Sequence, residues 1–137
     1  MRALSYLHGR GITHADIKLE NCLFASDRLD SLRLVDFGLS FNIKDHREVS
    51  VGSRGTLSYM APELLLLNRS QPVYVAELLP QVDVWSAGVI LFILTCGHFP
   101  FLETTHDEVV RLITSSEQQI HQHLASSRNW SALHPLL

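Results

Sequence analysis

The feature that most constrains this sequence is the stretch from Val84 to Leu102, which contains no Asp, Glu, Lys or Arg. Its length would suit a membrane span, but glycine, histidine and proline interrupt it. Its continuous apolar part, residues 88–94, is less than half of the roughly 20 residues that a spanning helix needs. A helix that is apolar on every side must be surrounded by other segments. The sequence therefore predicts a buried core helix over Val82–Cys96 and no membrane span.

Composition narrows the class of protein. The chain has 137 residues, enough for one domain, and with 46% hydrophobic and 18% charged residues it is too apolar to be disordered. Lys and Arg total 11 against 14 Asp and Glu, and no segment gathers basic residues, so we expect no nucleic-acid partner. Cys22 and Cys96 form no CxxC pair, and the N-terminal segment lacks the apolar stretch of a signal peptide. We therefore expect an intracellular protein, located in the cytoplasm or the nucleus.

Periodicity, turn residues and caps predict the remaining elements. The predicted helices are 1–8, 62–67, 82–96 and one that begins after a capping box of Thr105 and Glu108. The predicted strands are 12–14, 22–25 and 31–35, and residues 42–55 are a predicted loop. The periodicity weakens after Ser115, and the apolar residues within 130–137 suggest the first turns of a further helix.

His121 and His123 are two residues apart and would face different sides of a helix, so we expect them at the surface rather than on a metal.

Four short motifs follow one another along the chain. They are HADIKLEN at His14–Asn21, DFG at Asp36–Gly38, GTLSYMAPE at Gly55–Glu63 and DVWSAG at Asp83–Gly88. A given residue type occurs at a given position with a probability of roughly one in twenty, so four motifs in this order are not expected by chance. The ordered set resembles the C-terminal lobe of a eukaryotic protein kinase, from its catalytic loop to the helix after GHFPF. The resemblance implies an α+β fold: a mostly helical lobe with short strands around the catalytic loop.

The resemblance also implies catalytic roles. Phosphoryl transfer requires mainly positioning and charge neutralisation from the protein. Asp16 occupies the place of the family's catalytic aspartate, which receives or orients the attacking hydroxyl, and Lys18 would place a positive charge beside the moving phosphate. Asn21 and Asp36 occupy the places of the Mg²⁺ ligands, and their oxygen atoms suit this hard cation.

Further roles are implied around these residues. By resemblance, ATP would lie with its ribose at the backbone of Glu20 and its adenine above Leu23, and Thr56 would bond the catalytic Asp and Lys. His14 resembles the family histidine that packs against Phe37 and anchors the loop, so we expect a core histidine rather than an acid or base. Asp83 is expected to cap the buried helix by bonding backbone near His14.

The substrate class follows from the same resemblance. Lys18 two residues after Asp16, Thr56 before the APE sequence, and GHFPF resemble serine/threonine kinases, and ENCLF and GTLSYMAPELL resemble the calcium/calmodulin-dependent group. The implied reaction transfers the γ-phosphoryl group of ATP, with Mg²⁺, to a Ser or Thr hydroxyl of a protein substrate. A small-molecule phosphotransferase of kinase-like fold is an alternative, although it would not need the segment around Thr56 that presents a peptide.

One departure from the family concerns regulation. Ala15 stands where an arginine usually grips a phosphate on the activation loop through charge-assisted hydrogen bonds of about 1.5–3 kcal/mol each. Without this clamp, we expect activation to be independent of phosphorylation at Ser50 and Ser53. The complete protein with both serines changed to alanine should keep its turnover, and a near-complete loss would contradict this expectation.

A second departure concerns how much of a kinase domain the sequence contains. The sequence contains no glycine-rich loop, no strand lysine of the VAIK type and no downstream arginine to pair with Glu63. We interpret residues 1–137 as a partial kinase domain without the N-lobe and the last C-lobe helices. The isolated chain is then expected to be inactive, to bind ATP poorly and to expose apolar surface around Phe37 and Leu23. A truncated, non-catalytic scaffold is the other alternative.

Overall fold

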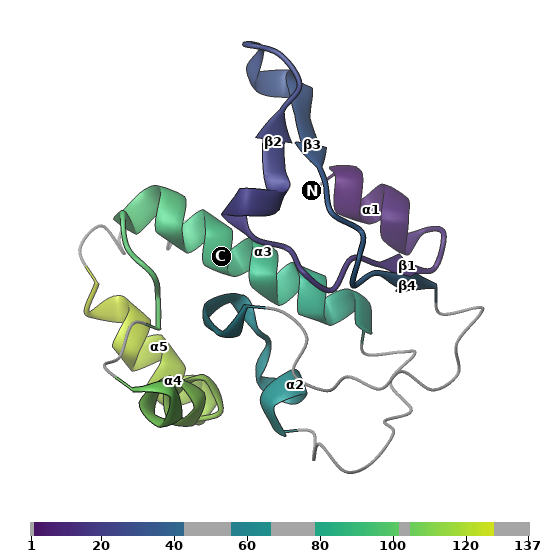
Figure 1. Cartoon of the computed structure of the whole chain (residues 1–137). Coiled ribbons are helices and arrows are strands. Elements are labelled where there is room, and N and C mark those ends of the chain that lie inside the picture. The colour runs from purple at the N-terminus through teal and green to yellow at the C-terminus, as the bar shows by residue number, and fades with distance from the viewer. Residues whose placement is uncertain (1, 43–55, 67–78, 102–104, 128–137) are drawn as a thin grey trace.

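The computed structural model describes residues 2–42, 56–66, 79–101 and 105–127. The helices are α1 (Arg2–His8), α2 (Pro62–Leu66), α3 (Leu79–Cys96), α4 (His106–Ile113) and α5 (Glu117–Ala125), and the strands are β1 (Ile12–Thr13), β2 (Cys22–Phe24), β3 (Leu32–Leu34) and β4 (Phe41–Asn42). Three 3₁₀ turns complete the described elements: η1 (Leu19–Asn21), η2 (Leu29–Ser31) and η3 (Leu57–Tyr59). The predicted mostly helical α+β fold with short strands is confirmed (Figure 1).

Two antiparallel strand pairs bring the first two motifs together. β1 pairs with β4, with Ile12 opposite Asn42, and β2 pairs with β3, with Cys22 opposite Leu34. Residues His14–Asn21 connect β1 to β2 and are called the catalytic loop below, after the family segment that they resemble, and the DFG segment connects β3 to β4. Because each strand of one connection pairs with a strand of the other, the two connections lie next to each other. Asn42 belongs to β4 and not to the predicted loop, and the other residues of that loop lie outside the described part.

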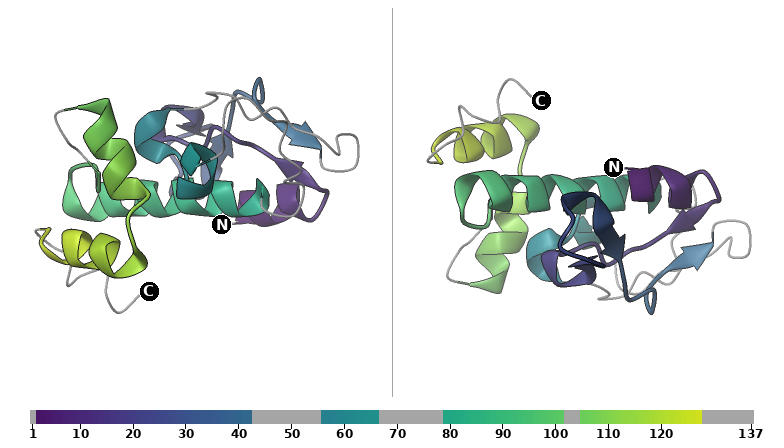
Figure 2. Two further views of the ribbon diagram at one scale, coloured as in Figure 1. Left: turned by 90° about the horizontal axis from the view of Figure 1, so that it is seen from below. Right: turned by 90° about the horizontal axis from the view of Figure 1, so that it is seen from above.

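Helix α3 crosses the centre of the molecule, and β1 and α1 lie at its N-terminal end (Figure 1). Figure 2 shows α4 and α5 on either side of its C-terminal end. There Phe92 and Cys96 pack against Leu124, and Phe101 belongs to a second cluster. These contacts cover one side of α3.

The prediction that α3 is surrounded on every side is wrong in part. Val84, Leu91 and Leu94 are exposed, Leu94 to 70%. These residues form a flank of α3 that no described segment covers, and an apolar sequence alone does not identify the segments that will cover it. No described helix combines the length and apolarity needed to cross a membrane.

Capping boxes begin both C-terminal helices. The predicted box is confirmed at α4, where the Thr105 hydroxyl accepts a hydrogen bond from the Glu108 backbone at 3.3 Å. Helix α5 was not predicted, yet it begins in the same way, since Ser116 accepts from the backbone of Gln119 at 3.4 Å. The S-x-x-Q pattern was the available signal. The apolar residues within 130–137 lie outside the described residues.

One of the two histidines of α5 is only partly at the surface. His121 is exposed, but His123 is half-buried, donates from Nε2 to the Pro100 carbonyl at 2.7 Å and stacks on Phe101. The surface prediction therefore holds for His121 and only in part for His123. It considered the helix alone and not the segment at Pro100 and Phe101 that contacts His123.

Candidate active site

Three predicted site residues converge within the catalytic loop. The Asp16 Oδ2 atom accepts hydrogen bonds from Lys18 Nζ at 2.7 Å and from Asn21 Nδ2 at 3.2 Å, and Asn21 Nδ2 also donates to the Asp16 carbonyl at 2.8 Å. Lys18 has an extended backbone, with φ −156° and ψ 166°. Residues two apart in an extended chain point to the same side, and the following 3₁₀ turn η1 brings Asn21 back. Local backbone geometry therefore assembles this part of the site.

The carboxylates around Lys18 hold it in the charged form. Its pKa is raised above the usual lysine value mainly by the hydrogen bond with Asp16, and the nearby charges of Asp16, Glu20 and Asp36 add to this, while burial acts in the opposite direction. Lys18 is thus an ammonium at neutral pH.

The DFG segment is attached to the catalytic loop through the backbone. Val35 N donates to the Asn21 carbonyl at 3.0 Å, immediately before Asp36. Asp36 itself is exposed and has a left-handed φ of 62°, and its Oδ1 accepts from Gly38 N at 3.2 Å. Aspartate tolerates this conformation better than most residues. Asp36 is therefore exposed to solvent and directly follows the residue that is bonded to the catalytic loop.

His14 has the predicted role of a core histidine. It is fully buried, and its ring lies 4.8 Å from that of Phe37. Its Nδ1 faces the backbone N–H of Asp16 at 3.4 Å, and its Nε2 lies 3.1 Å from the Val35 carbonyl. This pair of partners requires the proton on Nε2. The ring thus joins the catalytic loop to the DFG segment.

Asp83 fixes the backbone immediately before Asp16. Its buried carboxylate accepts from His14 N and from Ala15 N, both at 2.9 Å, which confirms the predicted contact. It also lies 2.8 Å from His8 Nε2, a contact that the sequence did not indicate. The predicted capping of its own helix is wrong, because α3 begins four residues earlier, at Leu79. Asp83 instead satisfies the donors of a loop whose Ala15 has a φ of 63°.

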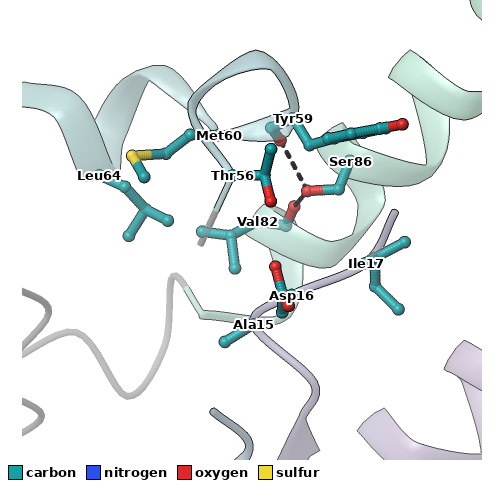
Figure 3. A pocket seen from close by; sticks show the side chains of 9 residues that line it. All are labelled: Ala15, Asp16, Ile17, Thr56, Tyr59, Met60, Leu64, Val82 and Ser86. Atoms are coloured by element: carbon teal, nitrogen blue, oxygen red, sulfur yellow. Dashed lines mark hydrogen bonds between the residues drawn. The ribbon is translucent and has the colours of Figure 1, made fainter. Parts of the chain in front are cut away.

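The segment around Thr56 borders the same site. Figure 3 shows Thr56 and Asp16 lining one cavity between the catalytic loop, η3 and α3. In the described part of the structure, no hydrogen bond joins the Thr56 hydroxyl to Asp16 or Lys18. Ser86, which sequence reasoning did not single out, also lines this cavity and donates to the Tyr59 carbonyl at 2.8 Å. Its place inside the DVWSAG motif was the only available signal.

The expected nucleotide contacts lie on the open side of the site. Glu20 is exposed on η1, Leu23 on β2 is 51% exposed, and Phe37 of the DFG segment is 44% exposed. The expected apolar surface is therefore present, and the adenine and ribose contacts remain predictions. Ser50 and Ser53 lie outside the described residues.

The oxygen atoms available for a metal are few. Among the described residues, no three His, Cys, Asp or Glu side chains gather into a metal cage. Asn21 uses its amide nitrogen for Asp16, so its amide oxygen keeps its acceptor capacity, and Asp36 offers a solvent-facing carboxylate. Two hard oxygen donors fit Mg²⁺, which retains several waters and takes phosphate oxygens as further ligands.

Comparison with known proteins agrees with this geometry. Residues 1–135 match the protein kinase domain family. The sequence is 37% identical over 134 residues to calcium-dependent protein kinase 6 of Plasmodium berghei, covering 98% of this chain and 8% of that protein. It is 36% identical over 125 residues to the SNF-related serine/threonine-protein kinase of Homo sapiens, covering 91% and 15%. It is 40% identical over 109 residues to calcium/calmodulin-dependent protein kinase type IV of Mus musculus, covering 79% and 21%. The chain therefore spans only 8% to 21% of the length of these three relatives, but the match extends over nearly all of its own residues, and the chain belongs to the protein kinase family.

Proposed function

We propose that this chain carries the catalytic loop of a serine/threonine protein kinase, which transfers the γ-phosphoryl group of ATP to a Ser or Thr hydroxyl of a protein. The observation that carries the proposal is the convergence of Lys18 Nζ and Asn21 Nδ2 on Asp16 Oδ2, together with the backbone hydrogen bond from Val35 that attaches the segment of Asp36 to Asn21. The name of the human relative, SNF-related serine/threonine-protein kinase, supports the Ser/Thr class.

Each residue has a defined task in this reaction. Asp16 accepts the proton of the attacking hydroxyl as the new oxygen–phosphorus bond forms and the bond between the γ-phosphorus and the bridging oxygen of ADP breaks. Lys18 offers a positive charge to the phosphoryl oxygens, which carry the negative charge of the transition state. Asn21 and Asp36 would hold Mg²⁺, which neutralises phosphate charge when bound.

A non-catalytic binding module is the second candidate. It is favoured by exposed apolar side chains near the catalytic loop in the sequence, Leu23 and Phe24 on β2 and Phe37 in the DFG segment, because such side chains suit a protein partner. A small-molecule phosphotransferase is less well supported, because the GTLSYMAPE segment borders Asp16 through Thr56 and occupies the side from which a peptide would be presented.

The test measures transfer of labelled γ-phosphate from MgATP by the full-length protein that contains this chain. A Ser/Thr peptide and an aminoglycoside serve as acceptors. Asp16→Asn should lower peptide phosphorylation by about 10²–10⁴-fold, the usual contribution of a catalytic acid or base. Asp27→Asn, on an exposed turn, is the matched control and should change it little. Equal rates for the two variants, or transfer to the aminoglycoside alone, would refute the proposal.

A further inference from the structure

The hydroxyl of Ser86 connects α3 to the η3 segment, 27 residues earlier in the sequence. Ser86 is 9% exposed, and its Oγ lies 2.8 Å from the Tyr59 carbonyl and 2.9 Å from the Val82 carbonyl, as the dashed lines in Figure 3 show. A hydroxyl has one proton to donate. Within an α-helix, the Val82 carbonyl already accepts from the backbone N–H four residues later. The Tyr59 carbonyl is therefore the acceptor that benefits most from this proton, and the bond attaches η3 to α3.

The attachment reaches Thr56 through the turn itself. Tyr59, the last residue of η3, donates from its backbone N–H to the Thr56 carbonyl at 2.9 Å. A hydrogen bond that closes a 3₁₀ turn fixes its first and last residues relative to each other. Thr56 lines the same cavity as Asp16 and Ser86. The Ser86 hydroxyl therefore acts, through one short turn, on the wall of the cavity that faces Asp16.

Helix α3 holds the opposite wall of this cavity as well. Asp83, three residues before Ser86 and thus on the same side of the helix, accepts from the backbone N–H groups of His14 and Ala15. These two residues directly precede Asp16. The catalytic loop and η3 are therefore attached to neighbouring turns of one helix, and the helix sets where Thr56 lies relative to Asp16.

The Ser86 hydroxyl can be removed without removing the packing of η3. The Tyr59 side chain is only 4% exposed, and its ring meets that of Phe99 edge to face at a centroid distance of 5.4 Å. This ring contact is independent of the hydroxyl on α3. A variant without the hydroxyl should therefore keep η3 packed against the molecule while its backbone opens more often.

We propose that Ser86 is a positioning residue that holds the η3 backbone on α3 and thereby sets the place of Thr56 relative to Asp16, on the side where the peptide acceptor would be presented. The functional part of this inference rests on the proposed kinase activity. Ser86 acts through the Tyr59 backbone and not on the reacting atoms. Its two consequences, a more stable η3 turn and tighter binding of the peptide, can be measured separately.

The first experiment compares Ser86→Ala with Ser5→Ala, which makes the same chemical change at an exposed position of α1. Hydrogen exchange of the full-length protein, measured by mass spectrometry, should show the Tyr59 and Met60 amides exchanging about 2- to 13-fold faster in Ser86→Ala, the factor that corresponds to one hydrogen bond. The Ala15 amide, which Asp83 holds, should keep its rate, and Ser5→Ala should change none of these amides.

A second variant separates hydrogen bonding from the filling of space. Ser86→Cys keeps a side chain of similar shape but replaces the hydroxyl with a weak S–H donor, so its η3 amides should also exchange faster. It supplies the measurement if Ser86→Ala does not fold. Wild-type exchange of the Tyr59 and Met60 amides in either variant would overturn the proposal, because the hydroxyl would then not hold η3.

A kinetic measurement on the full-length protein tests the functional part. Ser86→Ala should raise KM for the Ser/Thr peptide several-fold and leave KM for MgATP unchanged, because η3 borders the peptide side of Asp16. Unchanged KM for the peptide, or a change confined to KM for MgATP, would overturn the positioning role. If the unmodified protein transfers no phosphate, the proposed function fails, while the exchange data still decide whether Ser86 holds η3.

Discussion

Asp83 offers the most direct test of how α3 stabilises the catalytic loop. Its carboxylate, 1% exposed, accepts two backbone hydrogen bonds, from His14 and Ala15, and lies within 2.8 Å of His8 Nε2. A hydrogen bond to a charged group contributes about 1.5–3 kcal/mol. Asp83→Ala removes the carboxylate oxygens that accept from these two backbone N–H groups, and should therefore cost about 3–6 kcal/mol. This is a large part of the roughly 5–15 kcal/mol that a domain has in total.

The assay is urea unfolding of the full chain, followed by circular dichroism. Asp27→Ala, at an exposed position, is the control and should change the free energy of unfolding by less than about 0.5 kcal/mol. Asp83→Asn keeps one acceptor oxygen and should lose about half as much as Asp83→Ala, so it supplies the measurement if the alanine variant does not fold. If Asp83→Ala and Asp27→Ala had equal free energies of unfolding, the loop would not depend on α3 and the reasoning would be refuted.

Three further predictions follow from the charges and the exposure of the site. The pKa of Lys18 is raised by Asp16, so its stabilising contribution is complete below the unfolded value of about 10.4 and is lost as pH rises through the folded value. The difference in unfolding free energy between wild type and Lys18→Met should accordingly shrink above about pH 10.4, and a pH-independent difference would contradict it. Burial raises the pKa of the Cys22 and Cys96 thiols, so both should react with Ellman's reagent more slowly in the folded chain than in urea, and equal rates would be inconsistent with this burial. The chain alone should bind MgATP more weakly than micromolar in calorimetry, because its nucleotide side is open to solvent, and micromolar affinity would show that this side is already complete.

The parts of the site that the sequence predicts best are those assembled by local geometry. Asp16, Lys18 and Asn21 lie within one short loop, so their spacing already specifies that they can meet. Asp36 reaches the same place because two strand pairs join its segment to the loop, and only the family resemblance anticipated this. The His14 contact with Phe37 was anticipated for the same reason.

The contacts that the sequence did not predict depend on distant segments. His8 meets Asp83 across 75 residues, and Ser86 meets the Tyr59 carbonyl across 27. Neither pair has a periodic or capping signal, because helix and strand patterns report only neighbours along the chain. The exposed flank of α3 escaped prediction for the related reason that burial depends on which other segments are present.

Two backbone positions show what the distant contacts accomplish. Ala15 and Asp36 are the described non-glycine residues with positive φ, and they lie at the two ends of the site. A left-handed conformation costs an alanine about 1–2 kcal/mol, so Ala15 keeps it only if other interactions compensate. The carboxylate of Asp83 holds the Ala15 N–H, whereas the Asp36 side chain accepts from Gly38 in its own segment. The buried end of the site thus depends on α3 for its conformation, while the exposed end, which would meet the nucleotide, is supported locally and can respond to what binds there.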